Sequence, residues 1–276
     1  MIKNVHIKAY ERGLVFRNGN LIDILKEGSF WVFWNKSVEI YDMKYSFKSN
    51  TDLTLLLKNE RLKTMLDVVE VKDGEIVLVY ENGIFKEVLN VGQYAFWKGI
   101  FNREFQKIDL TKVEITENIS KNILENAKLK SFVRKFTITN QYKGLLLIDG
   151  KLDRVLEAGT YYFWNNEISV EVKAIDTRMQ QMEIAGQELL TKDKAMLRIN
   201  FYVRFQVENI VKALMENKEY DKQLYILMQL ALREFVGALT LDELLLKKDS
   251  VGKEILQNLG NKAEDLGLKA ADAGIR

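Results

Sequence analysis

One stretch of sequence occurs three times in this 276-residue chain, and this internal repeat restricts the fold more than any other feature. The copies read GLVFRNGNLIDILKEGSFWVFWN at 13–35, IVLVYENGIFKEVLNVGQYAFWK at 76–98 and GLLLIDGKLDRVLEAGTYYFWN at 144–165. Each copy contains one pair of glycines nine residues apart, Gly19/Gly28, Gly83/Gly92 and Gly150/Gly159, and the repeat period is 64 and then 67 residues. We therefore expect three versions of one small structural unit.

The first glycine of each pair follows an Asn or Asp, in Asn18-Gly19, Asn82-Gly83 and Asp149-Gly150. These dipeptides favour tight hairpin turns, because both residues tolerate a positive φ. The flanking runs are rich in β-branched and aromatic residues, so each copy predicts a hairpin followed by a return strand. We expect the aromatic side chains of the return strand to face a small core; a ligand cage or a membrane-dipping loop is the alternative. These side chains are Phe30 and Phe33, Tyr94 and Phe96, and Tyr161 and Phe163.

An aspartate recurs after each copy, at Asp42, Asp109 and Asp176. Recurrence in all three copies favours a structural role, such as accepting N–H bonds within a turn. A metal or acid–base site built from the three carboxylates would require the copies to converge on one point. A linear array of repeats does not provide that convergence.

Helical periodicity occurs between the copies. Apolar residues at helical spacing predict helices over Asp52–Leu66 and Glu117–Lys130, with Thr51 or Asp52 as the first N-cap. The repeat unit would then consist of a hairpin, a strand and a helix.

The chain continues differently after the third copy. Leu197–Val207 alternates apolar and polar residues, which predicts a strand with one buried face, paired with Met182–Leu190. Helices are predicted over Asp221–Leu239 and Asp249–Leu266. A capping box at Thr240–Glu243 separates these helices, and Gly267 is suited to cap the second one.

Composition excludes several kinds of chemistry. The chain has no Cys, no Pro and a single His, His6, which we interpret as a surface or edge-strand residue. It therefore cannot supply a thiolate nucleophile or a zinc site with two or three histidines. Lys and Arg number 41 against 39 for Asp and Glu, so the net charge of +2 gives no bulk reason to bind nucleic acid. We find no catalytic, cofactor-binding or metal-ligating motif.

Hydrophobicity bears on the cellular compartment. No run of 18 apolar residues exists, so the sequence predicts no transmembrane helix. The start, MIKNVHIKAYERG, lacks the apolar region of a signal peptide. We expect a cytoplasmic protein that lies peripheral to the inner face of the membrane.

The segment Ala185–Leu245 resembles the SPFH, or Band 7, domain of stomatins, prohibitins and flotillins. The matching features are the turn Thr191–Asp193, the alternating strand, the helix end at Leu230–Gly237 and the turn Thr240–Leu245. The chain is most similar to a bacterial slipin-like subgroup with two extra copies ahead of this domain. The resemblance extends over 130–276 and, more weakly, over 1–130. Its implication is a scaffold that forms homo-oligomers and organises lipids or regulates a membrane protease.

Two departures from the family pattern affect this expectation. The chain has neither an N-terminal hydrophobic hairpin nor a Cys for acylation. It also stops at AADAGIR, where the family continues into a Pro-containing strand and a long coiled coil, so we expect a truncated domain.

We therefore predict an α+β fold: three β-rich hairpin repeats with helical inserts, the last continuing into an SPFH-like domain. The expected boundaries are 1–66, 67–131 and 132–276. The expected function is a non-catalytic scaffold or adaptor that self-associates and contacts a membrane protease or another membrane protein. A monomeric regulatory module for a protein partner is the alternative, and an unidentified carboxylate-based hydrolase is third.

Two sets of residues are candidates for contacts. The membrane or partner candidates are Trp31, Trp34, Trp97 and Trp164. The self-association candidates are Arg198, Tyr202, Arg204, Leu256 and Leu259. The self-association candidates belong to the strand Leu197–Val207 and the helix Asp249–Leu266, which are long and regular and still present a second face after their core face is assigned. Trp and Tyr are enriched where proteins meet bilayer interfaces.

Overall fold

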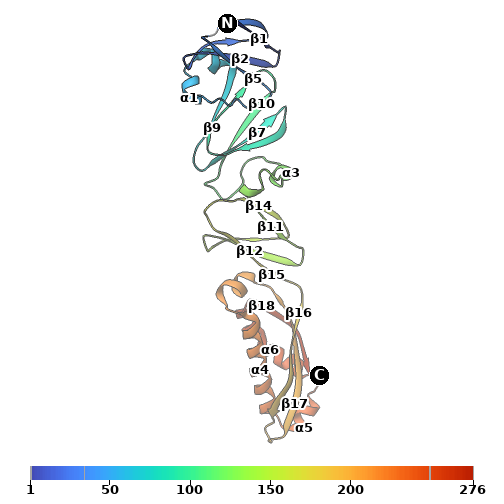
Figure 1. The fold of residues 1–276 in the computed structure, drawn as a ribbon. Helices are drawn as coiled ribbons and strands as arrows, with labels where there is room; N and C mark the ends of the chain where they lie inside the picture. The colour runs from blue at the N-terminus through green and yellow to red at the C-terminus, as the bar shows by residue number, and fades with distance from the viewer. Residues whose placement is uncertain (1, 34, 249, 276) are drawn as a thin grey trace. The chain divides into compact units, whose positions relative to one another are not determined.

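The structure is a computed structural model that describes residues 2–33, 35–248 and 250–275 (Figure 1). Its strands are distributed along the whole chain, and its longer helices lie toward the C-terminus, which confirms the predicted α+β class. The chain divides into two compact units. The first contains Met1–Arg134 and Tyr162–Asn166, and the second contains Lys135–Tyr161 and Glu167–Arg276.

Three successive sets of five strands, here called β-groups 1 to 3, share one pairing scheme. β-group 1 comprises β1 (Ile2–Ile7), β2 (Glu11–Arg17), β3 (Asn20–Leu25), β4 (Gly28–Phe33) and β5 (Ser37–Asp42). β-group 2 comprises β6 (Leu66–Val71), β7 (Glu75–Glu81), β8 (Ile84–Leu89), β9 (Gly92–Trp97) and β10 (Arg103–Asp109). β-group 3 comprises β11 (Val133–Ile138), β12 (Tyr142–Ile148), β13 (Lys151–Leu156), β14 (Gly159–Trp164) and β15 (Val170–Asp176). In each group the first strand pairs with the fourth, and the second is flanked by the third and fifth.

The predicted hairpin turns are confirmed. Asn18, Asn82 and Asp149 have φ values of 50°, 52° and 49°, and the glycines that follow them have φ values of 81°, 78° and 72°. Two consecutive positive φ values define the turn whose twist matches paired strands. The pairing register of each hairpin also shifts at an equivalent place, between Val15 and Phe16 in the first copy.

The fourth strand of each group differs from the prediction. It does not return to the hairpin but pairs antiparallel with the strand that precedes the hairpin, as β4 does with β1 and β9 with β6. The fifth strand pairs with the hairpin instead, as β5 does with β2. Each group therefore contains one two-stranded and one three-stranded sheet. In β-group 2 these sheets enclose a core of Val69, Val71, Val77, Val79, Leu89 and Phe96.

The expectation that Phe30 and Phe33 share one core is wrong. Val32 is buried against Val5 and Ile7, and Phe30 packs on this cluster, whereas Phe33 is 57% exposed. Successive side chains of a strand point to opposite faces, so two residues three positions apart cannot face the same way. Trp31 lies between Phe30 and Val32 in β4, points to the other face and is 71% exposed.

The predicted inter-repeat helices form only in part. Over 52–66 the chain makes two short helices, α1 (Leu53–Leu56) and α2 (Glu60–Met65). Asp52 caps the first, as predicted, but the Asn59 side chain accepts from the Leu62 amide and starts a second helix.

Over 117–130 the prediction of one helix is wrong. Only α3 (Lys121–Leu124) forms there, with a short 3₁₀ turn, η1 (Lys130–Phe132), after it. The Asn126 side chain accepts from the Lys128 amide, and local bonds of this kind compete with helix propagation.

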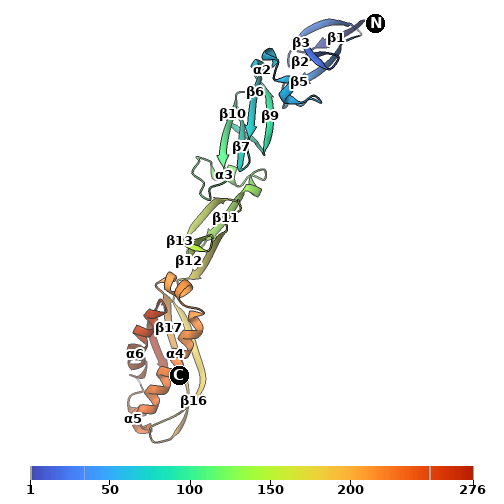
Figure 2. The same cartoon turned by 90° about the vertical axis from the view of Figure 1, so that its left-hand side faces the viewer.

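The C-terminal part is a three-stranded antiparallel sheet with helices on one face (Figures 1 and 2). Its strands are β16 (Gln180–Leu190), β17 (Met196–Val207) and β18 (Leu268–Ile275), in the order β16-β17-β18. Its helical elements are a π-turn, η2 (Lys212–Glu216), and the α-helices α4 (Tyr220–Ala238), α5 (Leu241–Leu246) and α6 (Val251–Asp265). The predicted strands, both long helices and the capping box at Thr240 and Glu243 are confirmed. The third strand, β18, includes the segment Ala270–Ile275 and pairs with β17.

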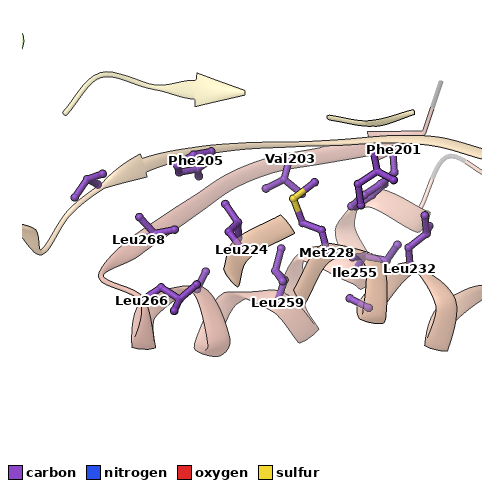
Figure 3. Close-up of a cluster of buried hydrophobic side chains, with 14 of the residues drawn as sticks. Phe201, Val203, Phe205, Leu224, Met228, Leu232, Ile255, Leu259, Leu266 and Leu268 are labelled. Carbon is purple, nitrogen blue, oxygen red and sulfur yellow. The ribbon is translucent and has the colours of Figure 1, made fainter. Parts of the chain in front are cut away.

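The core of this part lies between the sheet and its helices, as Figure 3 shows. Phe201, Val203 and Phe205 point from β17 toward α4 and α6. They pack against Leu224, Met228 and Leu232 of α4 and against Ile255 and Leu259 of α6. The apolar face predicted from the alternation in β17 is therefore the face that the helices cover.

Candidate interaction surfaces

The described residues bear on the predicted absence of metal ligands and of a membrane-spanning helix. They contain no group of three or more His, Asp or Glu side chains that could hold a metal ion. The sole histidine, His6, is exposed on β1, and its Nδ1 lies 3.0 Å from the Ser29 hydroxyl. No helix in the described part of the chain is long and apolar enough to cross a membrane.

The three recurrent aspartates serve turns, as predicted. Asp42, Asp109 and Asp176 each accept a hydrogen bond from the backbone N–H two residues later, at 2.9 Å in every case. The Thr111 hydroxyl donates to Asp109 and lowers the pKa of that carboxyl. The Arg178 guanidinium likewise lowers the pKa of Asp176. Local hydrogen bonds thus favour the ionised form of Asp109 and Asp176, and all three aspartates serve the turn that follows them.

The four candidate tryptophans lie in different environments. Trp31 projects into solvent from β4, while Trp34 lies outside the described residues. Trp97 and Trp164 are 1% and 0% exposed, so their predicted role in a membrane or partner contact is wrong for this structure. Both side chains are buried because apolar side chains of the preceding β-group pack against the strand that carries them.

The surroundings of the buried tryptophans follow one plan. Trp97, on β9, packs against Leu14, Phe16 and Ile24 of the three-stranded sheet of β-group 1. Trp164, on β14, packs against Ile76, Leu78 and Ile108 of the three-stranded sheet of β-group 2. Residues from the connecting segment complete each cluster. They are Leu56 and Leu62 beside Trp97, and Leu124 and Leu129 beside Trp164.

The polar face of β17 is the second candidate surface. Arg198 and Arg204 are exposed, and Tyr202 is half-buried. In the sheet register, Arg198 lies opposite Glu188 of β16, and Arg204 lies between Gln181 of β16 and Asp272 of β18. We call this surface, formed by alternate residues of β16, β17 and β18, the outer sheet face. It carries both signs of charge, and the helices α4 and α6 pack on the opposite face.

The two candidate leucines of α6 differ in burial. Leu259 is 0% exposed and belongs to the core between α6 and the sheet, so its predicted contact role is wrong for this structure. Leu256 is half-buried. The error arose because the heptad-like spacing of these residues also fits a helix that packs on a sheet.

Sequence reasoning missed several exposed apolar side chains near one end of the outer sheet face. Leu190 and Met196 pair across the β16–β17 hairpin and are exposed. Leu245 and Leu246 of α5 are exposed as well. A signal was present in the run Leu244–Leu246, since a short helix can bury only one side of three consecutive leucines.

Comparison with protein families matches residues 136–276 to the SPFH domain / Band 7 family. The chain belongs to the SPFH family. The match contains β12 to β18 and the helices α4 to α6, whereas β-groups 1 and 2 precede it. The predicted family resemblance is therefore confirmed.

Named relatives agree with this membership. The SPFH chain is 30% identical over 138 residues to an uncharacterized protein, MJ0827, of Methanocaldococcus jannaschii, covering 50% of this chain and 68% of the relative. It is 29% identical over 140 residues to a stomatin homolog, PH1511, of Pyrococcus horikoshii, covering 50% and 52%. Mouse stomatin is 23% identical over 142 residues, covering 50% and 49%. The chain thus spans about half the length of the two stomatin-named relatives.

Proposed function

We propose that this SPFH protein is a non-catalytic scaffold that self-associates through the outer sheet face. Family membership suggests a scaffold-like role without catalysis. The observation that carries the self-association is a long sheet with one face covered by helices and the other exposed. The exposed face includes Arg198, Asn200 and Arg204 of β17 and Gln181 and Glu183 of β16.

The charge pattern of this face supports pairing with a second copy. Arginines lie on the central strand, and carboxylates lie on both flanking strands, at Glu188 and Asp272. Two such faces, related by a twofold axis, can set the arginines of one copy against the carboxylates of the other. Tyr202 adds a rigid aromatic side chain, a type enriched in protein interfaces.

The experiment measures the mass of the 276-residue chain by light scattering across a concentration series. We expect species larger than a monomer at high micromolar concentration, weakening as salt is raised because exposed ion pairs are screened. Replacing Arg198 and Arg204 together by Gln should raise the dissociation constant about tenfold, since each exposed ion pair contributes up to about 1 kcal/mol. Arg233→Gln, on the exposed side of α4, is the matched control and should leave the mass unchanged.

The outcomes separate the candidate functions. A strict monomer at every concentration would refute self-association and favour the regulatory binding module for a protein partner. If the double substitution leaves the assembly unchanged, the scaffold function is retained, but the outer sheet face is not the interface through which the copies associate. Hydrolase activity that disappears in an Asp176→Asn or Asp193→Asn variant would instead support the carboxylate-based enzyme.

A further inference from the structure

The two sheets of a β-group enclose a small core, and β-group 2 fills part of its core with two aromatic rings. Phe96 of β9 and Phe105 of β10 lie with their ring centroids 5.4 Å apart. Phe96 is a buried member of the core cluster described above, and Phe105 packs on that cluster. In β-group 2 the rings at these two positions therefore occupy space between the two-stranded and the three-stranded sheet.

β-group 1 carries smaller side chains at both equivalent positions. Counted from the glycine that begins each fourth strand, Val32 occupies the position of Phe96. Val38 occupies the position of Phe105, because each lies opposite the equivalent residue of the second strand in its group. A valine side chain fills less space than a phenylalanine ring. We therefore expect β-group 1 to be underfilled where β-group 2 holds its pair of rings.

An open hollow with a volume of about 350 Å³ lies at this place. Val5, Val32 and Val38 supply the apolar part of its lining. Val5 and Val32 are buried members of one core cluster, so the hollow reaches the interior of β-group 1. Sites for small organic molecules have volumes of about 300–1,000 Å³. The hollow is thus large enough for one small ligand whose apolar part is about the size of an aromatic ring.

The polar part of the lining is positively charged. It consists of Lys3, Lys36 and Ser37. The segments 1–10 and 28–38, which supply the described lining, contain no Asp or Glu. Glu39, the next residue of β5, points to the opposite face of the strand from Val38 and accepts a hydrogen bond from the Tyr41 hydroxyl. Two ammonium groups and a hydroxyl suit a ligand with an anionic group, because hydrogen bonds to a charged acceptor are the stronger ones.

We propose that this hollow between β1, β4 and β5 binds a small carboxylate that carries an aromatic ring. The ring takes the place that Phe96 and Phe105 fill in β-group 2, and the carboxylate lies against Lys3 and Lys36. The site lies outside the segment that matches the SPFH family. It uses no residue of the outer sheet face, so it is an addition to the proposed scaffold function and does not depend on it.

The test titrates the 276-residue chain with three probes and follows the backbone amide shifts of β1, β4 and β5 by NMR. The first probe, 3-phenylpropionate, has a ring and a carboxylate. The second, 3-phenylpropionamide, has the ring without the charge, and the third, acetate, has the charge without the ring. We expect saturable binding of 3-phenylpropionate, binding of the amide that is weaker by at least about threefold, and no saturation by acetate, because burial of the ring supplies most of the affinity.

Val38→Phe is the decisive variant, because it supplies the ring that β-group 2 has at the equivalent position. It should abolish binding of 3-phenylpropionate and leave the thermal unfolding midpoint unchanged or higher. Val155→Phe is the matched control, since Val155 is 41% exposed on β13 and the substitution should leave binding unchanged.

A second pair of variants tests the charge. Lys3→Gln combined with Lys36→Gln should weaken binding of 3-phenylpropionate by about three- to tenfold and remove its preference over the amide. Lys151→Gln, at an exposed position of β13, should change neither quantity.

Three results would overturn the proposal. The first is a wild-type chain in which 3-phenylpropionate causes no saturable shifts in β1, β4 and β5. The second is unchanged binding in a folded Val38→Phe variant. The third is a double lysine variant that still prefers the carboxylate over the amide, and this measurement decides the question even if Val38→Phe fails to fold.

Discussion

At the scale of single residues, Trp97 and Trp164 share an unusual property. Each buries its indole N–H, and neither N–H has a hydrogen-bond partner among the described residues. A buried donor without an acceptor costs about 1–3 kcal/mol. The equivalent residue in β-group 1 is Phe33, which has no such donor. The ring rather than the N–H is therefore the part of tryptophan that these positions require.

This reasoning predicts that Trp97→Phe and Trp97→Ala differ strongly in their effect on the free energy of unfolding. The Ala variant loses a large buried ring and should be destabilised by about 3–5 kcal/mol. The Phe variant loses less surface and also removes the unpaired donor, so its destabilisation should stay below about 1.5 kcal/mol. Denaturant unfolding of both variants measures the difference. Similar losses in the two variants would show that the indole N–H finds a partner in solution.

The tryptophans also mark a limit of prediction from sequence. Trp31 and Trp97 lie on equivalent strands and in similar local sequences, yet one is exposed and the other is buried. Their exposure depends on whether a preceding sheet covers the strand, and no local pattern encodes that. The recurrent aspartates were predictable, because an Asx-type turn is determined within three residues.

At the scale of elements, the packing of α6 on β18 depends on one close approach. An added Cβ at Gly252, in the first turn of α6, would lie 1.9 Å from the carbonyl oxygen of Ala273. At Gly260, in the same helix, an added Cβ meets no atom within 4 Å. At this position α6 and β18 can therefore approach each other so closely only because Gly252 has no side chain.

We expect Gly252→Ala and Gly260→Ala to change stability in opposite directions. The first must displace β18 or α6, and we expect it to destabilise the protein by at least about 2 kcal/mol. The second replaces glycine within a helix at an open position and should stabilise by about 0.5–1 kcal/mol. Thermal unfolding of the two variants beside wild type provides the measurement. A neutral Gly252→Ala variant would contradict the close approach.

Elements with strong local patterns were the ones that sequence predicted. β17 was evident from its uninterrupted alternation, and α5 was evident from the capping box at Thr240 and Glu243. The helix expected over 117–130 failed because polar side chains such as Asn126 bond to nearby backbone. The pairing of β4 with β1 was missed, since a strand's partner is chosen by the packing of both sheets rather than by its own residues.

At the scale of the whole molecule, the buried clusters link segments that are neighbours in the chain. One cluster joins β-group 1, α1, α2 and β9, and another joins β-group 2, α3 and Trp164. A further cluster holds Leu145 and Ile175 of β-group 3 together with the sheet and helices that follow. Nearest-neighbour coupling of this kind is characteristic of repeat proteins.

Such coupling predicts that a core substitution acts locally. Leu62 of α2 is fully buried in the cluster that joins β-group 1 to β9. Leu62→Ala should destabilise that region by about 2–5 kcal/mol and reduce hydrogen-exchange protection in β2 and β9. Protection in β17 and α6, which lie in another cluster, should be unchanged. Loss of protection along the whole chain would show that unfolding is a single cooperative event.

The paired glycine turns and the order of the clusters bear on how the protein is made. Each hairpin closes through a turn whose residues are adjacent, and each cluster is completed by the segment that is synthesised next. A chain emerging from a ribosome can therefore add structure in the order of translation, with every new β-group closing on apolar surface that is already in place. If translation pauses between two β-groups, one aromatic or aliphatic sheet face stays exposed to solvent. We expect a chaperone to bind the nascent chain at that stage.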